Sequence, residues 1–242
     1  MTNKIYIVGT PIGNMEDITL RALRILKEVD IIACEDVRVT KKLLDRYDIT
    51  NKKLVTYNNF NEETTSNYLL KQYEEGLNIA LVSDAGMPVM SDPGFELIKK
   101  CYQHNINVEI IPGVNAAVTT FVMSNLDNNF TFKGFIKDKS QQRINQLKSL
   151  EFGTYIFYVS PHKLIDTLKD INQVFNGEEK LFLAKELTKM HEEFFRGNSI
   201  EIIDILNKRE AIKGEYTLVL SFKKNKKEKV NKYINLKQKI MH

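Results

Sequence analysis

Short apolar runs alternate with stretches of helical periodicity along the first half of the chain. In the first such stretch, Ala22, Ile25, Leu26 and Val29 fall on one face, as in a helix that packs on a sheet. We expect strands at 4–9, 30–34, 54–57, 79–82 and 108–111, and helices at 18–29, 40–47, 63–75 and 95–103. Strands that alternate with helices pair in parallel. The pattern therefore predicts an α/β fold with a mostly parallel N-terminal sheet and helices on both faces.

The second half of the chain has longer polar connections. A helix is expected at 115–124, and the polar run 125–129 then marks a boundary along the chain. We expect strands at 130–135, 155–159, 180–184 and 216–222, a weaker strand pattern at 192–195, and helices at 142–150, 164–175 and 200–208. This arrangement favours a smaller α/β domain with a mixed sheet, and 242 residues suffice to bury two cores.

The loop from Ser83 to Gly94 has an unusual density of Asp, Gly and Pro at the carboxyl end of a buried strand. Ligands of open α/β sheets bind at that edge. Turns that contain both Gly and Pro also follow the first strand, at 10–14, and the fifth, at Pro112-Gly113. Because the strands are expected to be parallel, the three turns should share one edge and line a single cleft.

Several familiar chemistries do not fit these loops. The first turn is neither a dinucleotide-binding GxGxxG nor a phosphate-binding P-loop, and the four His and two Cys show no metal-ligand spacing, so no metal site is expected. No Gly-x-Ser-x-Gly elbow occurs. Asp84 and Asp92 are either paired acids or caps for backbone N–H groups. The chemistry that remains is a reactive small molecule held by shape, for which S-adenosylmethionine is suitable.

The net charge of +4 comes mostly from the last twenty residues, 223–242, which hold eight Lys and one Glu. This tail is either a solvated extension or an arm that attracts phosphates, and the rest of the chain is near −3. No apolar run is long enough to span a bilayer, the N-terminus lacks a signal-peptide pattern, and both Cys lie in core-like segments. We expect a cytoplasmic protein without a membrane partner.

A series of motifs resembles one known family in both sequence and order. They are Thr10-Pro-Ile-Gly-Asn14, Glu35-Asp-Val-Arg38, Ser83-Asp-Ala-Gly-Met-Pro88, Ser91-Asp-Pro-Gly94, Pro112-Gly113, Tyr158-Val-Ser-Pro-His162, Ala184-Lys-Glu-Leu-Thr-Lys189 and Gly214-Glu215. The chain resembles the ribosomal RNA small subunit methyltransferase I family of the tetrapyrrole-methylase superfamily over residues 5–222. The resemblance implies a homodimer that uses S-adenosylmethionine for 2′-O-methylation of a cytidine in the decoding region of 16S rRNA or the small ribosomal subunit.

The resemblance also implies an organisation and a set of site residues. It implies two α/β domains with the cofactor cleft between them, which we place at 1–113 and 114–222. The Lys-rich tail over 223–242 lies outside the resemblance. The cofactor-binding residues would be Pro11, Asp84, Ala85, Gly86, Ser91, Asp92, Pro112, Gly113, Tyr158 and Ala184. Arg38, Lys185 and Lys189 would contact RNA phosphate, with surface ion pairs as the alternative.

A 2′-hydroxyl must lose its proton during methyl transfer, so a nearby carboxylate or neutral amine is expected to assist. Glu186, flanked by Lys185, is the first catalytic candidate, and Asp36 is the second; a strand-end ion pair is the alternative role for Glu186. The chain departs from the family pattern at Phe60, Met87, Asn115 and Val159. Two other functions stay open: methylation of a tetrapyrrole-like small molecule, and RNA or ribosome binding without catalysis.

Overall fold

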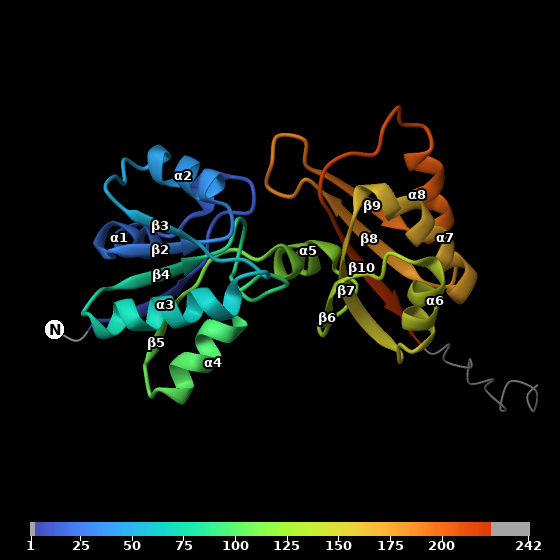
Figure 1. Cartoon of the computed structure of the whole chain (residues 1–242). Coiled ribbons are helices and arrows are strands. Elements are labelled where there is room, and N and C mark those ends of the chain that lie inside the picture. Colours follow the sequence, from blue (N-terminus) through green and yellow to red (C-terminus); the bar gives the residue numbers. More distant parts are fainter. Residues whose placement is uncertain (1–2, 224–242) are drawn as a thin grey trace, which may run out of the picture.

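The computed structural model describes residues 3–223, which form two β-sheets, each covered by helices (Figure 1). The prediction for the Lys-rich tail falls almost entirely on residues 224–242, outside the described residues. No helix within residues 3–223 is long and apolar enough to cross a membrane.

The N-terminal sheet is parallel throughout and has the strand order β3-β2-β4-β1-β5. Its strands are β1 (Ile5–Val8), β2 (Ile31–Cys34), β3 (Lys53–Thr56), β4 (Ile79–Val82) and β5 (Val108–Ile111). Alternate residues of each strand enter separate cores, one shared with α1 (Leu20–Glu28) and α2 (Val37–Arg46), the other with α3 (Glu62–Glu74) and α4 (Phe95–Gln103). The predicted parallel sheet with helices on both faces is confirmed.

Two of the helix starts that differ from the prediction, those of α1 and α2, do so because of capping side chains. The Thr19 hydroxyl accepts a hydrogen bond from the Ala22 N–H, so α1 begins at Leu20, and residues 15–17 form a separate 3₁₀ turn. The Asp36 carboxylate accepts from the Arg38 N–H, so α2 begins at Val37, three residues before the predicted start. Helix initiation therefore followed the side chain able to cap the first N–H groups.

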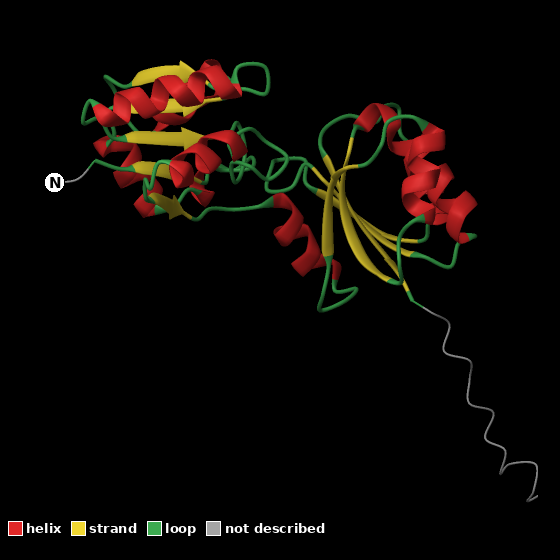
Figure 2. Ribbon diagram, turned by 60° about the horizontal axis from the view of Figure 1, so that its bottom comes forward, coloured by secondary structure: helices red, strands yellow, loops and turns green. Residues whose placement is uncertain are grey.

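The C-terminal sheet is mixed, with the order β6-β7-β10-β8-β9. Its strands are β6 (Thr131–Phe135), β7 (Gly153–Val159), β8 (Lys180–Lys185), β9 (Glu193–Gly197) and β10 (Tyr216–Phe222). Only β6 and β7 pair in parallel; the other neighbouring strands are antiparallel. Helices α6 (Ser140–Lys148), α7 (Leu164–Phe175) and α8 (Ser199–Leu206) cover one face (Figure 2). The predicted mixed sheet is confirmed.

Helix α5 (Ala116–Ser124) covers the opposite face of the C-terminal sheet. Ala117 packs there with Phe182 and Val219 in a core that also takes in Ile12 from the N-terminal half. Arg196 on β9 donates hydrogen bonds of 2.6 and 2.5 Å to the last carbonyl groups of the helix. The chain therefore passes from β5 straight onto the second sheet, and the two halves share apolar packing at their junction.

Candidate functional site

The turns after β4, β1 and β5 meet at one edge of the N-terminal sheet, where these three strands are neighbours. The Thr10 N–H donates to the Gly86 carbonyl at 2.8 Å, and the Gly86 N–H donates back at 3.1 Å. The Gly9 N–H donates to the Ile111 carbonyl at 2.9 Å, which joins the first turn to the end of β5. The prediction that these turns converge is confirmed.

Close backbone contact between Gly9 and Gly113 makes this convergence possible. A Cβ atom on Gly9 would lie 2.7 Å from the Gly113 Cα, and one on Gly113 would lie 2.9 Å from the Gly9 Cα. The Gly113 N–H points to the Met87 sulfur, 3.3 Å away. Both positions therefore need glycine, because a side chain on either would push the turns apart.

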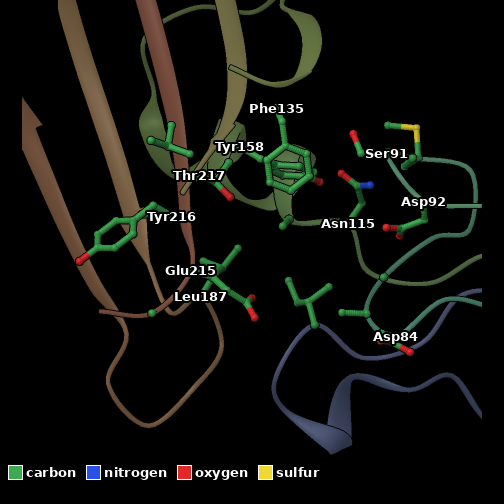
Figure 3. Close-up of a pocket in the computed structure, with 18 of the residues that line it drawn as sticks. Asp84, Ser91, Asp92, Asn115, Phe135, Tyr158, Leu187, Glu215, Tyr216 and Thr217 are labelled. Carbon is green, nitrogen blue, oxygen red and sulfur yellow. The ribbon is translucent and has the colours of Figure 1, made fainter. Parts of the chain in front are cut away.

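A cavity of about 430 Å³ lies between the converged turns and the C-terminal sheet (Figure 3). From the N-terminal half and the start of α5 it is lined by Ile12, Asp84, Ala85, Gly86, Met87, Met90, Ser91, Asp92, Asn115 and Ala116. From the C-terminal half it is lined by Phe135, Tyr158, Val159, Ser160, Pro161, Ala184, Leu187, Gly214, Glu215, Tyr216 and Thr217. Its size falls within the range of small-molecule sites, about 300–1,000 Å³.

Seven predicted cofactor-binding residues line this cavity, namely Asp84, Ala85, Gly86, Ser91, Asp92, Tyr158 and Ala184. Pro11 instead lines an adjacent hollow of about 180 Å³. Neither Pro112 nor Gly113 lines the cavity, and the Gly113 N–H instead points to the sulfur of Met87. Sequence reasoning missed Phe135, Leu187 and Thr217, which only the folding of distant strands and loops brings to the site.

Charged side chains that line the cavity, among the described residues, are all acids: Asp84, Asp92 and Glu215. Burial, reinforced by the charge of Glu35, raises the pKa of Asp92 to about 6, although a hydrogen bond from Ser83 opposes the shift. Burial also raises the pKa of Asp84, against a hydrogen bond of 2.9 Å from the Asp36 N–H. Such a lining favours a cationic ligand and holds one carboxyl group able to exchange a proton near neutral pH.

The loop that carries both of these Asp residues, over 84–94, has a strained backbone. Val89 and Ser91 have φ angles of 75° and 74°, a region that non-glycine residues, and β-branched ones above all, rarely adopt. Each such residue costs about 1–3 kcal/mol and persists only where its surroundings enforce it, most often at functional sites. The strain is therefore consistent with a ligand-binding role for this loop.

Tyr158 forms a rigid aromatic part of the opposite wall. Its ring meets Phe132 and Phe135 edge-on, with centroids 5.1 and 5.4 Å apart. In Figure 3, Phe135 and Tyr158 lie across the cavity from Asp92 and Ser91. An apolar ligand face can pack against these rings while polar groups bind the acid-bearing loops.

The predicted catalytic residues Glu186 and Lys185 lie outside the cavity lining. Lys189 pairs with Glu186 at 3.1 Å and with Glu215 at 3.0 Å. Burial alone raises the pKa of Glu186, but the Glu215 N–H and Lys189 together bring it below its ordinary value. Lys185 pairs with Glu193 at 3.2 Å. The ion-pair alternatives considered for these residues are therefore present, and their functional roles stay predictions.

Asp36 and Arg38 face a third, open hollow of about 590 Å³. Their carboxylate and guanidinium groups pair at 2.6 Å, and hydrogen bonds from Arg38 lower the pKa of Asp36 to about 2. Asp84 lines this hollow, the cavity of about 430 Å³ and the small hollow that holds Pro11 and Lys189. The predicted RNA-contacting and catalytic residues are thus distributed around the cavity, with Asp84 at the junction.

Comparison with known proteins identifies close relatives. A family model described as Tetrapyrrole (Corrin/Porphyrin) Methylases matches residues 4–203. The chain is 53% identical over 221 residues to "Ribosomal RNA small subunit methyltransferase I" of Mycoplasmopsis pulmonis, covering 91% of this chain and 98% of that one. It is 46% identical over 234 residues to the protein of the same name from Mesomycoplasma conjunctivae, covering 96% and 97%.

The fold is also found in solved structures. A uroporphyrin-III C-methyl transferase from Thermus thermophilus, in complex with S-adenyl homocysteine, superposes with a TM-score of 0.63 at 17% identity. The match covers 90% of this chain and 97% of the other. At this identity the likeness establishes a shared fold.

Proposed function

The chain belongs to the ribosomal RNA small subunit methyltransferase I family of tetrapyrrole methylases, and we propose that it methylates small-subunit ribosomal RNA with S-adenosylmethionine. The acid-lined cavity between the two sheets is the observation that carries this proposal. S-adenosylmethionine supplies a methyl group already activated by its positive sulfonium. The protein then needs to bind the cofactor, orient the acceptor and exclude water.

The lining of the cavity fits this cofactor in charge and in shape. Asp84, Asp92 and Glu215 complement a sulfonium and an ammonium group, and the rings of Tyr158 and Phe135 offer an apolar surface for adenine. The related structure with S-adenyl homocysteine lends further support, since it shares this fold.

We further propose that the acceptor is the 2′-hydroxyl of a cytidine in the decoding region of 16S rRNA. The sequence offers Glu186, Lys185 and Asp36 as candidate acceptors for the hydroxyl proton, and the structure adds Asp92. Asp92 lines the cavity, and its pKa of about 6 suits proton transfer near neutral pH. Glu186 is engaged by Lys189 and the Glu215 N–H, which weakens it as a base. We therefore favour Asp92 over Glu186, Lys185 and Asp36.

The RNA backbone is proposed to contact Arg38, Lys185 and Lys189. Arg38 supports this role best, because its side chain is 87% exposed while Asp36 fixes its position. Lys189 lines the small hollow beside the cavity. These cations would attract phosphates in a salt-dependent manner.

Two measurements test the proposed function. Isothermal titration calorimetry of the full chain with S-adenosylmethionine should show binding at one site. Mapping of 2′-O-methyl groups in small-subunit RNA, incubated with and without the protein, should reveal one new modified cytidine. Cofactor binding without RNA methylation would favour a small-molecule substrate. RNA binding without cofactor binding would favour the non-catalytic alternative.

We propose that two copies of the chain associate through α5. Its outer face exposes Val118, Val122 and Met123 at 47, 70 and 43%, while its inner face packs on the C-terminal sheet. Contiguous exposed apolar residues on one helix are typical of protein interfaces. Light scattering should show a dimer, and Val122→Asp should convert it to a monomer. A matched exposed substitution on another helix, Leu20→Asp, should leave the dimer intact.

A further inference from the structure

We propose that Phe60 is the stacking platform for the nucleobase of the nucleotide that is methylated, an inference that rests on the proposed RNA substrate. Phe60 lies in the turn between β3 and α3, and its side chain is 99% exposed. The turn borders the open hollow, which is lined by Glu35, Asp36, Val37, Arg38, Thr56, Asn58, Asn59, Phe60 and Asp84. A fully exposed phenyl ring contributes little to packing and is available to contact a ligand.

Neighbouring side chains hold the turn that carries Phe60. The Asn58 side-chain oxygen accepts from the Phe60 N–H at 3.0 Å, and the Asn61 side-chain oxygen accepts from the Asn58 N–H at 2.8 Å. The Asn61 amide also donates to the Thr56 carbonyl at 3.0 Å. One of these hydrogen bonds is made by the Phe60 backbone, and all three hold the turn without involving the ring. The turn therefore does not have to be ordered when a ligand binds, which lowers the entropy lost on binding.

Glu62 fastens the same turn to the loop that lines the cofactor cavity. Its Oε1 atom accepts from the N–H groups of Gly94 and Glu96 at 2.8 and 3.0 Å, and from the Tyr57 hydroxyl at 3.2 Å. These contacts supply the capping that Gly94 itself cannot give to α4. Asn61 and Glu62 therefore have structural roles, and Phe60 between Asn59 and Asn61 is left facing solvent.

The chemistry of the hollow suits a base better than a phosphate. Inside the hollow, Glu35, Asp36 and Asp84 outnumber the cation Arg38, so a phosphate bound within it would meet net negative charge. The Arg38 side chain is 87% exposed and can still contact a phosphate outside the hollow. Side-chain amides of Asn58 and Asn59 and the carboxylates can instead hydrogen-bond the edge of a base, and carboxylates accept from the exocyclic amine of cytosine. An aromatic ring beside such groups matches the way proteins bind single-stranded bases.

Asp84 connects this hollow to the cofactor cavity, since it lines both. A nucleotide whose base rests on Phe60 would therefore place its ribose on the side of the cavity that holds Asp84. A nucleotide that leaves its stack to enter an active site loses stacking energy, and an exposed aromatic platform compensates for part of that loss. The geometry thus assigns positioning of the acceptor to Phe60.

Steady-state methyl transfer to small ribosomal subunits from cells lacking this enzyme tests the proposal. Phe60→Ala should raise the KM for subunits at least about fivefold, because stacking on one aromatic side chain contributes about 1–3 kcal/mol per base. Phe60→Tyr and Phe60→His should stay within about threefold of the wild type, since they retain an aromatic face. The dissociation constant for S-adenosylmethionine and the Tm should be unchanged in every variant, because the ring is exposed.

Two controls make the test decisive. Phe60→Leu keeps an apolar side chain without a π face, so it should behave like Phe60→Ala; wild-type behaviour would overturn stacking in favour of an apolar protein contact. Tyr102→Ala removes an aromatic ring that is 68% exposed at the C-terminal end of α4, and it should have no effect. An unchanged KM in Phe60→Ala refutes the platform alone. Absence of methyl transfer by the wild-type protein refutes the proposed function instead.

Discussion

The two walls of the cofactor cavity are built in different ways. The N-terminal wall consists mainly of strand-end loops and carries two partly buried acids, Asp84 and Asp92, beside residues with positive φ angles. The C-terminal wall draws largely on residues within or next to the mixed sheet, such as Tyr158, Ala184 and Thr217, held by continuous strand pairing. The N-terminal wall therefore contains unfavourable backbone angles and partly buried charges at the ligand site. The C-terminal wall gives the ligand a rigid surface.

This difference teaches where substitutions should harm the protein. Substitutions in the C-terminal wall, or in the residues packed beneath it, should lower stability. A densely packed core cannot fully collapse into the space that a smaller side chain leaves. Changes in the loop wall should lower activity and leave stability equal or higher, since strain and buried charge serve binding. The predictions below test this contrast, beginning with the largest effect.

Phe182→Ala should have the largest effect on stability. Phe182 is fully buried beneath the C-terminal wall, with the Arg196 guanidinium 4.4 Å from its ring centroid, but it does not line the cavity. Its loss should lower the free energy of unfolding by about 3–5 kcal/mol, measured by urea denaturation. Phe152→Ala, at a ring that is 61% exposed, should cost far less. Equal losses in the two variants would contradict the contrast.

Asp92→Asn should stabilise the protein at neutral pH by about 2 kcal/mol, a figure reduced from the full pKa shift because Asp92 is partly exposed, and it should abolish methyl transfer. The folded-state pKa, about 6, lies above the ordinary value of 3.8, so the folded protein binds the proton more tightly between these values. Wild-type stability should therefore fall as the pH rises through this window. Denaturation of both proteins at several pH values should show the difference growing with pH and vanishing below about pH 4. A destabilised variant at pH 8 would refute the charge burial.

Ser91→Gly should stabilise the protein by about 0.5–1 kcal/mol, because glycine adopts the φ of 74° without strain. Thermal unfolding provides the measurement. Ser149→Gly is the matched control, since Ser149 is also exposed but has a φ of −83° at the end of α6. That substitution should be neutral or destabilising. A loss of stability in Ser91→Gly would show that the loop backbone is not strained.

Glu186→Gln should have the smallest effect, a loss of about 0.5 kcal/mol from the partly exposed pair with Lys189. Because the pKa of Glu186 is lowered, its stabilising contribution should be present above the unfolded-state pKa and lost as the pH falls through the folded-state value. Methyl transfer should keep an inflection near pH 6, the pKa of Asp92. A variant that lacks this inflection would restore Glu186 as the proton acceptor.

Local patterns were enough to predict both sheets and the meeting of the three turns. Apolar runs at 79–82 and 108–111 and the turns that follow them are short-range signals, and parallel pairing places their ends together. The helix starts at Val37 and Leu20 were harder to predict than the strands, because they depend on which side chain caps the first N–H groups.

The C-terminal wall could not be predicted to the same extent. Phe135 and Thr217 reach the cavity through the pairing of β6 and β10 with β7, contacts between segments far apart in the chain. Phe60 was noticeable in the sequence only as a departure from the family pattern. Its exposure became evident once Asn58 and Asn61 were seen to use their side chains on the backbone of the turn.

Glu62 has a consequence for the order of events in catalysis. Because one carboxylate oxygen joins the turn that bears Phe60 to the start of α4, any shift of residues 84–94 on cofactor entry is transmitted to that turn. Affinities for cofactor and RNA are then linked, and by thermodynamic reciprocity each ligand changes the binding of the other by the same factor. A protein with this tether would bind RNA with an affinity that depends on whether its cofactor cavity is occupied.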